Sequence, residues 1–277
     1  MIPPIASRFV GGETPAEAVD TAWDLQDRQV GAILNLLGEH YTDPEDAAGD
    51  RDAYRDLLAD IEDPELRACV SVKPSQLGLD VGADTFRENA RLVVEAAAEH
   101  DGFVWFDMED HETTDVTLDA VEAFATDGHD VGVCMQANLR RTEADVERFA
   151  DVPAKVRLVK GAYDEPEAIA YTDRAAVNDA YRDLLTQAFE TYDGGVAVGS
   201  HDEQMIEHAI ECHEATGTDF EFQFLAGVRE DRLFDLAETY ECWQYVPYGG
   251  KWFSYFSRRV LERKENALFA LRAILNR

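Results

Sequence analysis

The chain has 277 residues, 45% of them hydrophobic, and a formal net charge of −32 from 57 acidic and 25 basic residues. This acidic excess excludes a nucleic-acid-binding surface, because phosphate backbones are bound by clustered cations. No apolar run reaches about 18 residues, which excludes a membrane-spanning helix, and the length suits one barrel domain of about 250 residues.

The first residues, MIPPIASRFV, lack the basic region and apolar stretch of a secretory signal, so we expect a cytoplasmic protein. The four cysteines are widely spaced and form no CxxC pair; they are Cys69, Cys134, Cys212 and Cys242. We expect buried, reduced thiols and not disulfide partners or zinc ligands. No metal site is predicted, since the sequence also lacks an HExxH motif.

Acidic residues recur along most of the predicted helices, and only five of the 25 basic residues are lysines. This pattern resembles the solvated acidic surface of a halophilic protein. Each lysine retained in such a composition calls for a local explanation; the five are Lys73, Lys155, Lys160, Lys251 and Lys264.

The first expected element along the chain is an amphipathic helix over residues 15–28. Eight short, apolar, β-branched runs follow, and they start at Val30, Arg67, Phe103, Asp130, Lys155, Gly195, Phe220 and Cys242. Nearly continuous apolar runs of this kind are typical of strands in a parallel sheet that helices cover.

Segments with helical period separate the runs. Residues 85–100 place apolar side chains on one face and charged ones on the other. Asp84 and Thr114 are expected N-caps, and Pro166 is expected near the start of a helix that reaches about Thr191. Eight strands alternating with eight helices predict a closed (β/α)8 TIM-like barrel with an extra N-terminal helix. An open, doubly wound sheet is the alternative.

Polar side chains end seven of the eight runs, at the carboxyl ends of the strands, where barrel enzymes carry their active sites. They are Lys73; Asp107, Glu109 and Asp110; Gln136 and Asn138; Arg157, Lys160 and Tyr163; His201 and Asp202; Gln223; and Tyr245 and Tyr248. Any one of them can serve as a loop cap, but their convergence from seven strands favours a common site.

The segment VRLVKGAY places Arg157 and Lys160 beside Gly161, a residue that lets backbone approach a ligand closely. Two cations next to a glycine favour an anion or a conjugated electron acceptor as the ligand. Beside a flavin, a guanidinium can hydrogen-bond the ring and stabilise the negative charge that accumulates on reduction. Surface ion pairing is the alternative interpretation.

The last predicted helix carries Tyr255, Arg258, Arg259 and Glu262 at i, i+3, i+4 and i+7, which puts them on one face. Adjacent arginines bind a carboxylate well, because each guanidinium matches its two oxygens. An ordinary amphipathic helix with ion pairs is the alternative.

Several enzyme classes are excluded by missing motifs. The sequence has no GxGxxG after a strand, no GxxxxGK[ST] and no GxSxG, the signatures of dinucleotide-binding, P-loop and α/β-hydrolase sites. His208 and His213 are expected on a helix surface and not as metal ligands.

These segments together resemble the proline dehydrogenase family, in particular its short, monofunctional bacterial and archaeal form. The matching motifs follow the family's order: SVKPSQLG around Lys73, FDMED around Asp107, MQANLRR around Gln136, VRLVKGAY around Arg157, SHD at His201, EFQFLAG at Gln223, and YVPYG with WFSYFSRRVLE at the end. The VRLVKGAY and YxxRRxxE segments are highly specific.

The resemblance implies that residues 1–277 form a single, distorted catalytic barrel domain with non-covalent FAD at the strand ends and L-proline against the flavin. Asp107 and Arg157 resemble the catalytic pair, with Arg157 near the hydride-accepting ring nitrogen. The implied substrate-binding residues are Lys73, Tyr245, Tyr255, Arg258 and Arg259. The implied FAD contacts are Met108, Gln136, Arg157, Lys160, Gly161, Ala162, Ser200, His201 and Gln223.

The implied reaction is hydride transfer from proline to FAD, which gives 1-pyrroline-5-carboxylate in the first step of proline catabolism to glutamate. A quinone is the expected electron acceptor, reached by brief peripheral contact with the membrane, and a 1-pyrroline-5-carboxylate dehydrogenase is the expected downstream partner. Solvent or the region of Asp107 accepts the amine proton. The alternatives are a flavoenzyme for another carboxylated amine, such as hydroxyproline, and a non-catalytic amino-acid-binding barrel.

The acidic surface predicts that salt stabilises the protein. Its 32 excess negative charges repel one another within a Debye length of about 10 Å at about 0.1 M salt, and higher salt screens this repulsion. The melting temperature and the activity should therefore rise between low and molar KCl. A melting temperature that does not change across this range would contradict the halophilic interpretation.

Overall fold

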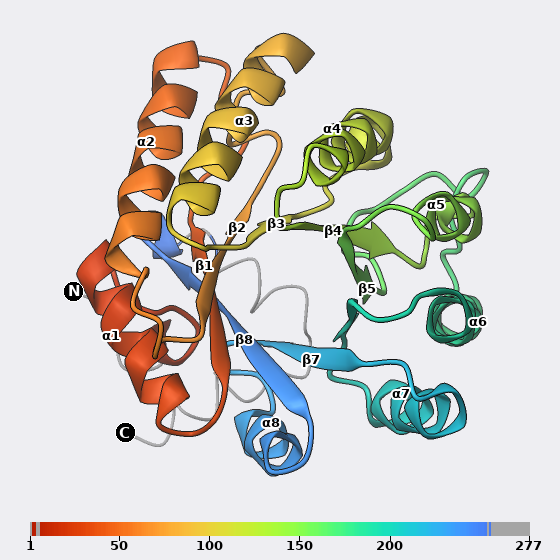
Figure 1. Cartoon of the computed structure of the whole chain (residues 1–277). Coiled ribbons are helices and arrows are strands. Elements are labelled where there is room, and N and C mark those ends of the chain that lie inside the picture. Colours follow the sequence, from red (N-terminus) through yellow and green to blue (C-terminus); the bar gives the residue numbers. More distant parts are fainter. Residues whose placement is uncertain (1, 4–5, 254, 256–277) are drawn as a thin grey trace.

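The computed structural model describes residues 2–3, 6–253 and 255. Eight parallel strands follow one another in chain order around a closed barrel, and helices lie outside them (Figure 1). The predicted (β/α)8 TIM-like barrel is thus confirmed, and the open doubly wound sheet is wrong, because β1 and β8 pair in parallel and close the sheet.

Each of the eight apolar runs contains one strand. The strands are β1 (Gly31–Leu36), β2 (Ala68–Val72), β3 (Val104–Phe106), β4 (Val131–Gln136), β5 (Lys155–Val159), β6 (Val196–Gly199), β7 (Phe220–Leu225) and β8 (Glu241–Tyr248). Their side chains are mostly buried on both faces, which explains why the runs are apolar throughout and do not alternate.

The described helices are α1 (Pro15–Gln26), α2 (Pro44–Asp60), α3 (Ala83–Glu99), α4 (Thr114–Thr126), α5 (Thr142–Arg148), α6 (Arg174–Thr191), α7 (Glu203–Thr216) and α8 (Glu230–Ala237), with short 3-10 helices at η1 (Ala6–Arg8) and η2 (His111–Thr113). The extra N-terminal helix is confirmed as α1, which contacts β1 and β8 and lies between α2 and α8 in the outer ring (Figure 1). A helix follows each strand from β1 to β7. The segment expected to form the helix after β8 lies mostly outside the described residues.

Two predicted N-caps are wrong by one or two residues. Helix α3 begins at Ala83 with Gly82 as its cap, and Asp84 lies in the first turn. There its negative charge interacts favourably with the positive end of the helix dipole. Helix α4 begins at Thr114 itself. Because η2 leads directly into α4, Thr113 at its cap already has helical backbone angles.

The predicted start of α6 near Pro166 is also wrong, although its end at Thr191 is correct. The helix starts at Arg174, because the Asp173 carboxylate accepts hydrogen bonds from the N–H groups of Ala175 and Ala176 at 2.9 and 3.2 Å. An aspartate in this position satisfies two N–H groups that the first helical turn leaves free.

The main hydrophobic core fills the layer between helices and barrel, and a smaller cluster fills the barrel interior: Ile33, Cys69, Trp105 and Ala197. Two glycines leave room for interior tryptophans. A Cβ on Gly31 would lie 2.4 Å from the Trp243 ring, and one on Gly132 would lie 2.6 Å from the Trp105 ring. The four cysteines are all buried and free, as predicted.

No helix in the described part of the chain has both the length and the apolar character needed to cross a membrane. Within the same residues, no group of three His, Cys, Asp or Glu side chains is arranged to hold a metal ion.

Candidate active site

A cavity of about 320 Å³ opens at the carboxyl ends of the strands, a size at the lower end for small-molecule sites. It brings together most of the predicted site residues: Lys73, Asp107, Met108, Gln136, Arg157, Lys160, Gly161, Ala162, His201, Gln223, Tyr245 and Tyr255. Ser200 is buried but does not line this cavity; its hydroxyl accepts a hydrogen bond from the Asp202 N–H at 3.3 Å. Arg258 and Arg259 lie outside the described residues.

The carboxylate of Asp107, directly after β3, lies at the centre of the polar contacts in the cavity. Its Oδ1 accepts hydrogen bonds from Ser71 Oγ at 2.8 Å and from Arg157 Nη2 at 2.9 Å, and its Oδ2 accepts one from the Tyr245 hydroxyl at 2.6 Å. Because both oxygens already accept hydrogen bonds, this arrangement suits an anchor for its neighbours better than a proton acceptor.

Arg157 is a buried cation, only 4% exposed. Its guanidinium stacks 4.7 Å from the centre of the Trp105 ring and 5.7 Å from that of Tyr245. Burial lowers the pKa of Arg157, but the charge of Asp107, together with smaller effects of Cys134, Tyr245 and Cys69, raises that pKa by more, so the group stays charged. Its Nε is buried without a hydrogen-bond partner among the described residues, which leaves one N–H donor for a ligand.

The hydroxyl of Tyr245 donates to Asp107 and stays protonated. Burial raises the pKa of Tyr245 well above its ordinary value, and the negative charge of Asp107 raises it further. Tyr248 was also a candidate, but it packs in the main core outside the barrel. Residues three apart on a strand point to opposite faces, so Tyr245 faces the barrel interior and Tyr248 does not.

The chain after β5 forms one wall of the cavity. Lys160 Nζ donates to Asn178 Oδ1 and Asp202 Oδ2, both at 2.6 Å. Gly161 has φ +102°, and a Cβ there would lie 2.1 Å from Asn138 Oδ1, so only glycine fits. Asn138 Oδ1 is itself buried without a partner in the described part of the chain.

After the neighbouring strand β6, His201 is held by the backbone and by an aromatic ring. Its Nε2 accepts a hydrogen bond from the Leu225 N–H at 2.9 Å, so in the neutral ring the proton is on Nδ1. The ring packs edge-on against Phe224, with 4.9 Å between centroids. Gln136 Nε2 donates to the Glu109 carbonyl at 2.7 Å, which ties the ends of β4 and β3 together.

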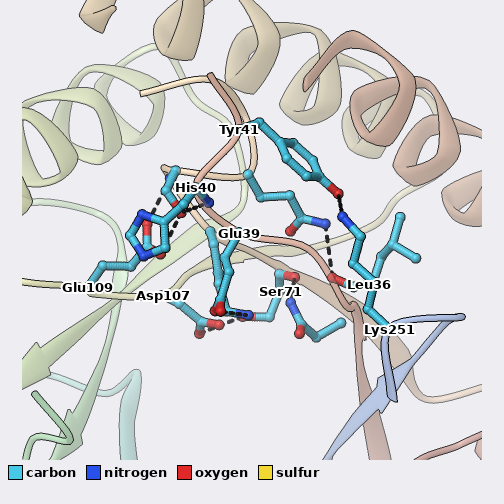
Figure 2. A network of polar contacts seen from close by, with 12 residues as sticks. Leu36, Glu39, His40, Tyr41, Ser71, Asp107, Glu109 and Lys251 are labelled. Atoms are coloured by element: carbon cyan, nitrogen blue, oxygen red, sulfur yellow. Dashed lines mark hydrogen bonds and ion pairs between the residues drawn. The ribbon is translucent and has the colours of Figure 1, made fainter. Parts of the chain in front are cut away.

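The loop between β1 and α2 carries Glu39, His40 and Tyr41, which take part in the network of polar contacts in Figure 2. Glu39 lines the cavity, with its Oε2 3.9 Å from Lys73 Nζ. Tyr41 accepts a hydrogen bond from Lys251 Nζ at 2.7 Å and donates one to Asp50 at 2.8 Å. The loop therefore links Lys73, just after β2, to Lys251, just after β8.

Two of these residues were absent from the candidates chosen from the sequence. Ser71 lies on β2, two positions before Lys73, which directly follows the strand. Strand alternation therefore puts both on the same face, and this was a usable signal. Glu39 follows β1 in an irregular loop, where no periodicity indicates which way a side chain points.

The carboxylate of Glu109 holds the turn after β2 in place through two hydrogen bonds to Ser75. Its Oε2 accepts from the Ser75 N–H and its Oε1 from the Ser75 hydroxyl, both at 2.7 Å. Burial raises the pKa of Glu109 by more than these hydrogen bonds lower it. The Ser75 hydroxyl also accepts a hydrogen bond from the His40 N–H at 3.0 Å, so the turn supports the β1–α2 loop.

Comparisons with known proteins point to one family. The family model described as proline dehydrogenase matches residues 18–272. The proline dehydrogenase of Deinococcus radiodurans is 34% identical over 98% of this chain and 90% of its own length. Proline dehydrogenase 1 of Bacillus subtilis is 32% identical over 98% of this chain and 91% of its own length.

Solved structures give the same fold. The chain matches the crystal structure of proline utilization A from Bdellovibrio bacteriovorus, inactivated by N-propargylglycine, with a TM-score of 0.85 and 22% identity over 95% of this chain. The match to proline utilization A from Bradyrhizobium japonicum has a TM-score of 0.74 and 21% identity over 94% of this chain. The chain spans about a third of the length of these proteins, so the likeness supports the barrel fold alone.

The His40–Asp80 pair, at 2.9 Å, predicts pH-dependent stability of the β1–α2 loop. Partial burial lowers the pKa of His40, but the hydrogen bond to Asp80 and the nearby carboxylates raise it by more. A raised histidine pKa stabilises the fold below about pH 6.5, and this stabilisation is lost as the pH rises through the raised value. Asp80→Asn should therefore lower the melting temperature at about pH 5.5 and change it little at about pH 9.

Asp52→Asn is the matched control, because Asp52 pairs with Arg51, which does not titrate in this range. Its effect on the melting temperature should be equal at the two pH values. An Asp80→Asn effect that is likewise equal at both would contradict the assignment to His40.

Proposed function

Because the chain belongs to the proline dehydrogenase family, we propose that it oxidises L-proline to 1-pyrroline-5-carboxylate with FAD bound at the carboxyl ends of the strands. The observation that carries the proposal is the buried cation of Arg157 in the cavity of a chain that matches this family over residues 18–272.

The groups around the cavity fit a flavin. A flavin ring has both an N–H donor and oxygen or nitrogen acceptors along one edge. The cavity offers an acceptor for the donor and a donor for the acceptors. Gln223 Oε1 and Arg157 Nε are buried without partners within the described residues, and the Gly161 backbone is open to close approach. Buried polar groups without partners are costly, by about 1–3 kcal/mol each, so a ligand that pairs them binds favourably.

The remaining proposed FAD contacts are Met108, Gln136, Lys160, Ala162, Ser200 and His201. A bound flavin supplies the two-electron acceptor for the oxidation. Arg157 stabilises the negative charge that develops on the acceptor side, and Asp107 with Ser71 holds its guanidinium in place.

The proline carboxylate is bound by Lys73 with Arg258 and Arg259, and the rings of Tyr245 and Tyr255 enclose the rest of the substrate. Proline with a neutral amine loses a hydride from the carbon next to nitrogen and a proton from nitrogen, which leaves the C=N bond of the product. Since both Asp107 oxygens already accept hydrogen bonds, the proton goes to solvent.

The wider setting follows from this reaction. The chain acts as a single catalytic domain over residues 1–277 in the cytoplasm. Electrons leave to a quinone through peripheral contact with the membrane, and a 1-pyrroline-5-carboxylate dehydrogenase takes the product toward glutamate. Tyr255, buried against the cavity, favours proline over hydroxyproline, because a ring hydroxyl would crowd it.

Arg258→Met and Arg259→Met test the proposed carboxylate clamp, that is, the binding of the proline carboxylate by these two arginines. Each replacement keeps an unbranched side chain and deletes the guanidinium. Each charge-assisted hydrogen bond contributes roughly 1.5–3 kcal/mol, so each variant should lose about 10- to 150-fold in kcat/KM for proline. Steady-state kinetics measure this loss, and heat denaturation should release FAD from both variants as from the wild type.

Arg55→Met is the control, because Arg55 lies on the surface of α2 beside Asp52 and surface pairs contribute little. Its proline kinetics should match the wild type. Wild-type kinetics in both clamp variants would contradict the clamp, and a supernatant that contains no flavin, or only FMN, would contradict the FAD assignment.

A further inference from the structure

Lys155 is one of the few lysines in this acidic chain, and it starts β5 at the end of the barrel opposite the site. Its Nζ donates to Glu221 Oε2 at 2.7 Å. The Glu221 side chain is only 7% exposed, although it carries a charge. Lys155 is on β5 and Glu221 is on β7, and β6 lies between these two strands. The residue of β6 next to Glu221 in the sheet is Ala197, whose small side chain leaves space for Lys155 and Glu221 to meet.

Glu221 in turn determines the orientation of Gln223. The two residues are consecutive on the inner face of β7, and Gln223 Nε2 donates to Glu221 Oε1 at 2.6 Å. A carboxylate only accepts hydrogen bonds, whereas a carboxamide has one donating and one accepting end. The amide nitrogen of Gln223 must therefore face Glu221, and its carbonyl oxygen must point away.

That carbonyl oxygen belongs to a side chain that lines the active-site cavity. It is buried and has no hydrogen-bond partner in the described part of the chain. Buried acceptors in native proteins are nearly always paired, so this one calls for an N–H donor supplied by a ligand. The pyrimidine ring of a flavin carries one such N–H, between its two carbonyl groups.

We propose that Glu221, held by Lys155, is a positioning residue that fixes the Gln223 carboxamide with its oxygen toward the cofactor, where it accepts a hydrogen bond from the flavin ring N–H. The proposal rests on FAD as the cofactor. Without Glu221 the carboxamide is free to turn over, and its NH2 group then meets the N–H of the ring, so the contact is lost.

The test measures the dissociation constant of FAD from the apoprotein by fluorescence titration. Glu221→Gln keeps the size of the side chain but both donates and accepts, so it no longer dictates the orientation of Gln223. It should weaken FAD binding about 3- to 10-fold, the effect of one hydrogen bond, and Gln223→Leu should weaken it at least as much.

The double variant decides whether Glu221 acts through Gln223. If it does, Glu221→Gln causes no further loss of FAD affinity in the Gln223→Leu background, and the single effects are not additive. The visible absorption bands of the bound flavin should shift in the same direction in both single variants. Additive losses, or a lower melting temperature with unchanged affinity and bands, would overturn the proposal.

Glu241→Gln is the matched control. Glu241 lies at the same end of the barrel, pairs with Arg67 and is 47% exposed, but its hydrogen bonds are to Arg67 and Trp243 and not to Gln223. FAD affinity should be unchanged in this variant and in Lys155→Arg, which keeps the cation. A tenfold loss of affinity in Glu241→Gln would show a general effect of charge at this end and would overturn the specific role of Glu221.

Lys155→Met provides a second route if Glu221→Gln fails to fold, because Lys155 is 40% exposed and its replacement leaves no buried cavity. It should weaken FAD binding in the wild-type background and not in Gln223→Leu. A wild-type apoprotein that binds no FAD would overturn the proposed function together with this inference. If the wild type binds FAD and both Glu221→Gln and Lys155→Met bind it with the same affinity, the inference alone is overturned.

Discussion

The ion pair between Arg157 and Asp107 is the interaction on which the site depends. A guanidinium buried inside a barrel is tolerated only with a partner and with hydrogen bonds for its donors. Asp107 supplies the charge, and Ser71 and Tyr245 donate to the same carboxylate. These four residues come from β2, β5, β8 and the end of β3. The polar cluster therefore joins β5 and β8 to the adjacent strands β2 and β3, with which neither of them pairs through the backbone.

The interior of the barrel determines where this cluster lies. Trp105 and Trp243 fill the space next to glycines on neighbouring strands, and the charged pair of Lys155 and Glu221 lies near the opposite end of the barrel from the cavity. Side chains two residues further along β5 and β7, Arg157 and Gln223, then face the cavity. Because side chains two residues apart on a strand lie on the same face, the buried contact between Lys155 and Glu221 can determine the orientation of Gln223, the next inward side chain on β7.

The fold could be read from the sequence because strands buried on both faces leave continuous apolar runs, and each run contains one strand. The helix starts were predicted less accurately. Helix α3 begins at Ala83 after Gly82, which has no side chain to act as a cap, and α6 begins at Arg174, well after Pro166, where the sequence predicted its start. Of the two residues missed near the site, Ser71 could have been identified by strand alternation. Glu39 and the hydrogen bond between Gln223 and Glu221 depend on a loop path and on contacts across the barrel, which no local pattern encodes.

The central claim is that this barrel holds a flavin that L-proline reduces. The most direct measurement is the visible absorbance spectrum of the purified protein, recorded without oxygen before and after addition of L-proline. The account predicts the bands of an oxidised flavin before addition and their loss afterwards. A protein without flavin bands, or one whose flavin bands do not change with saturating proline, would contradict it.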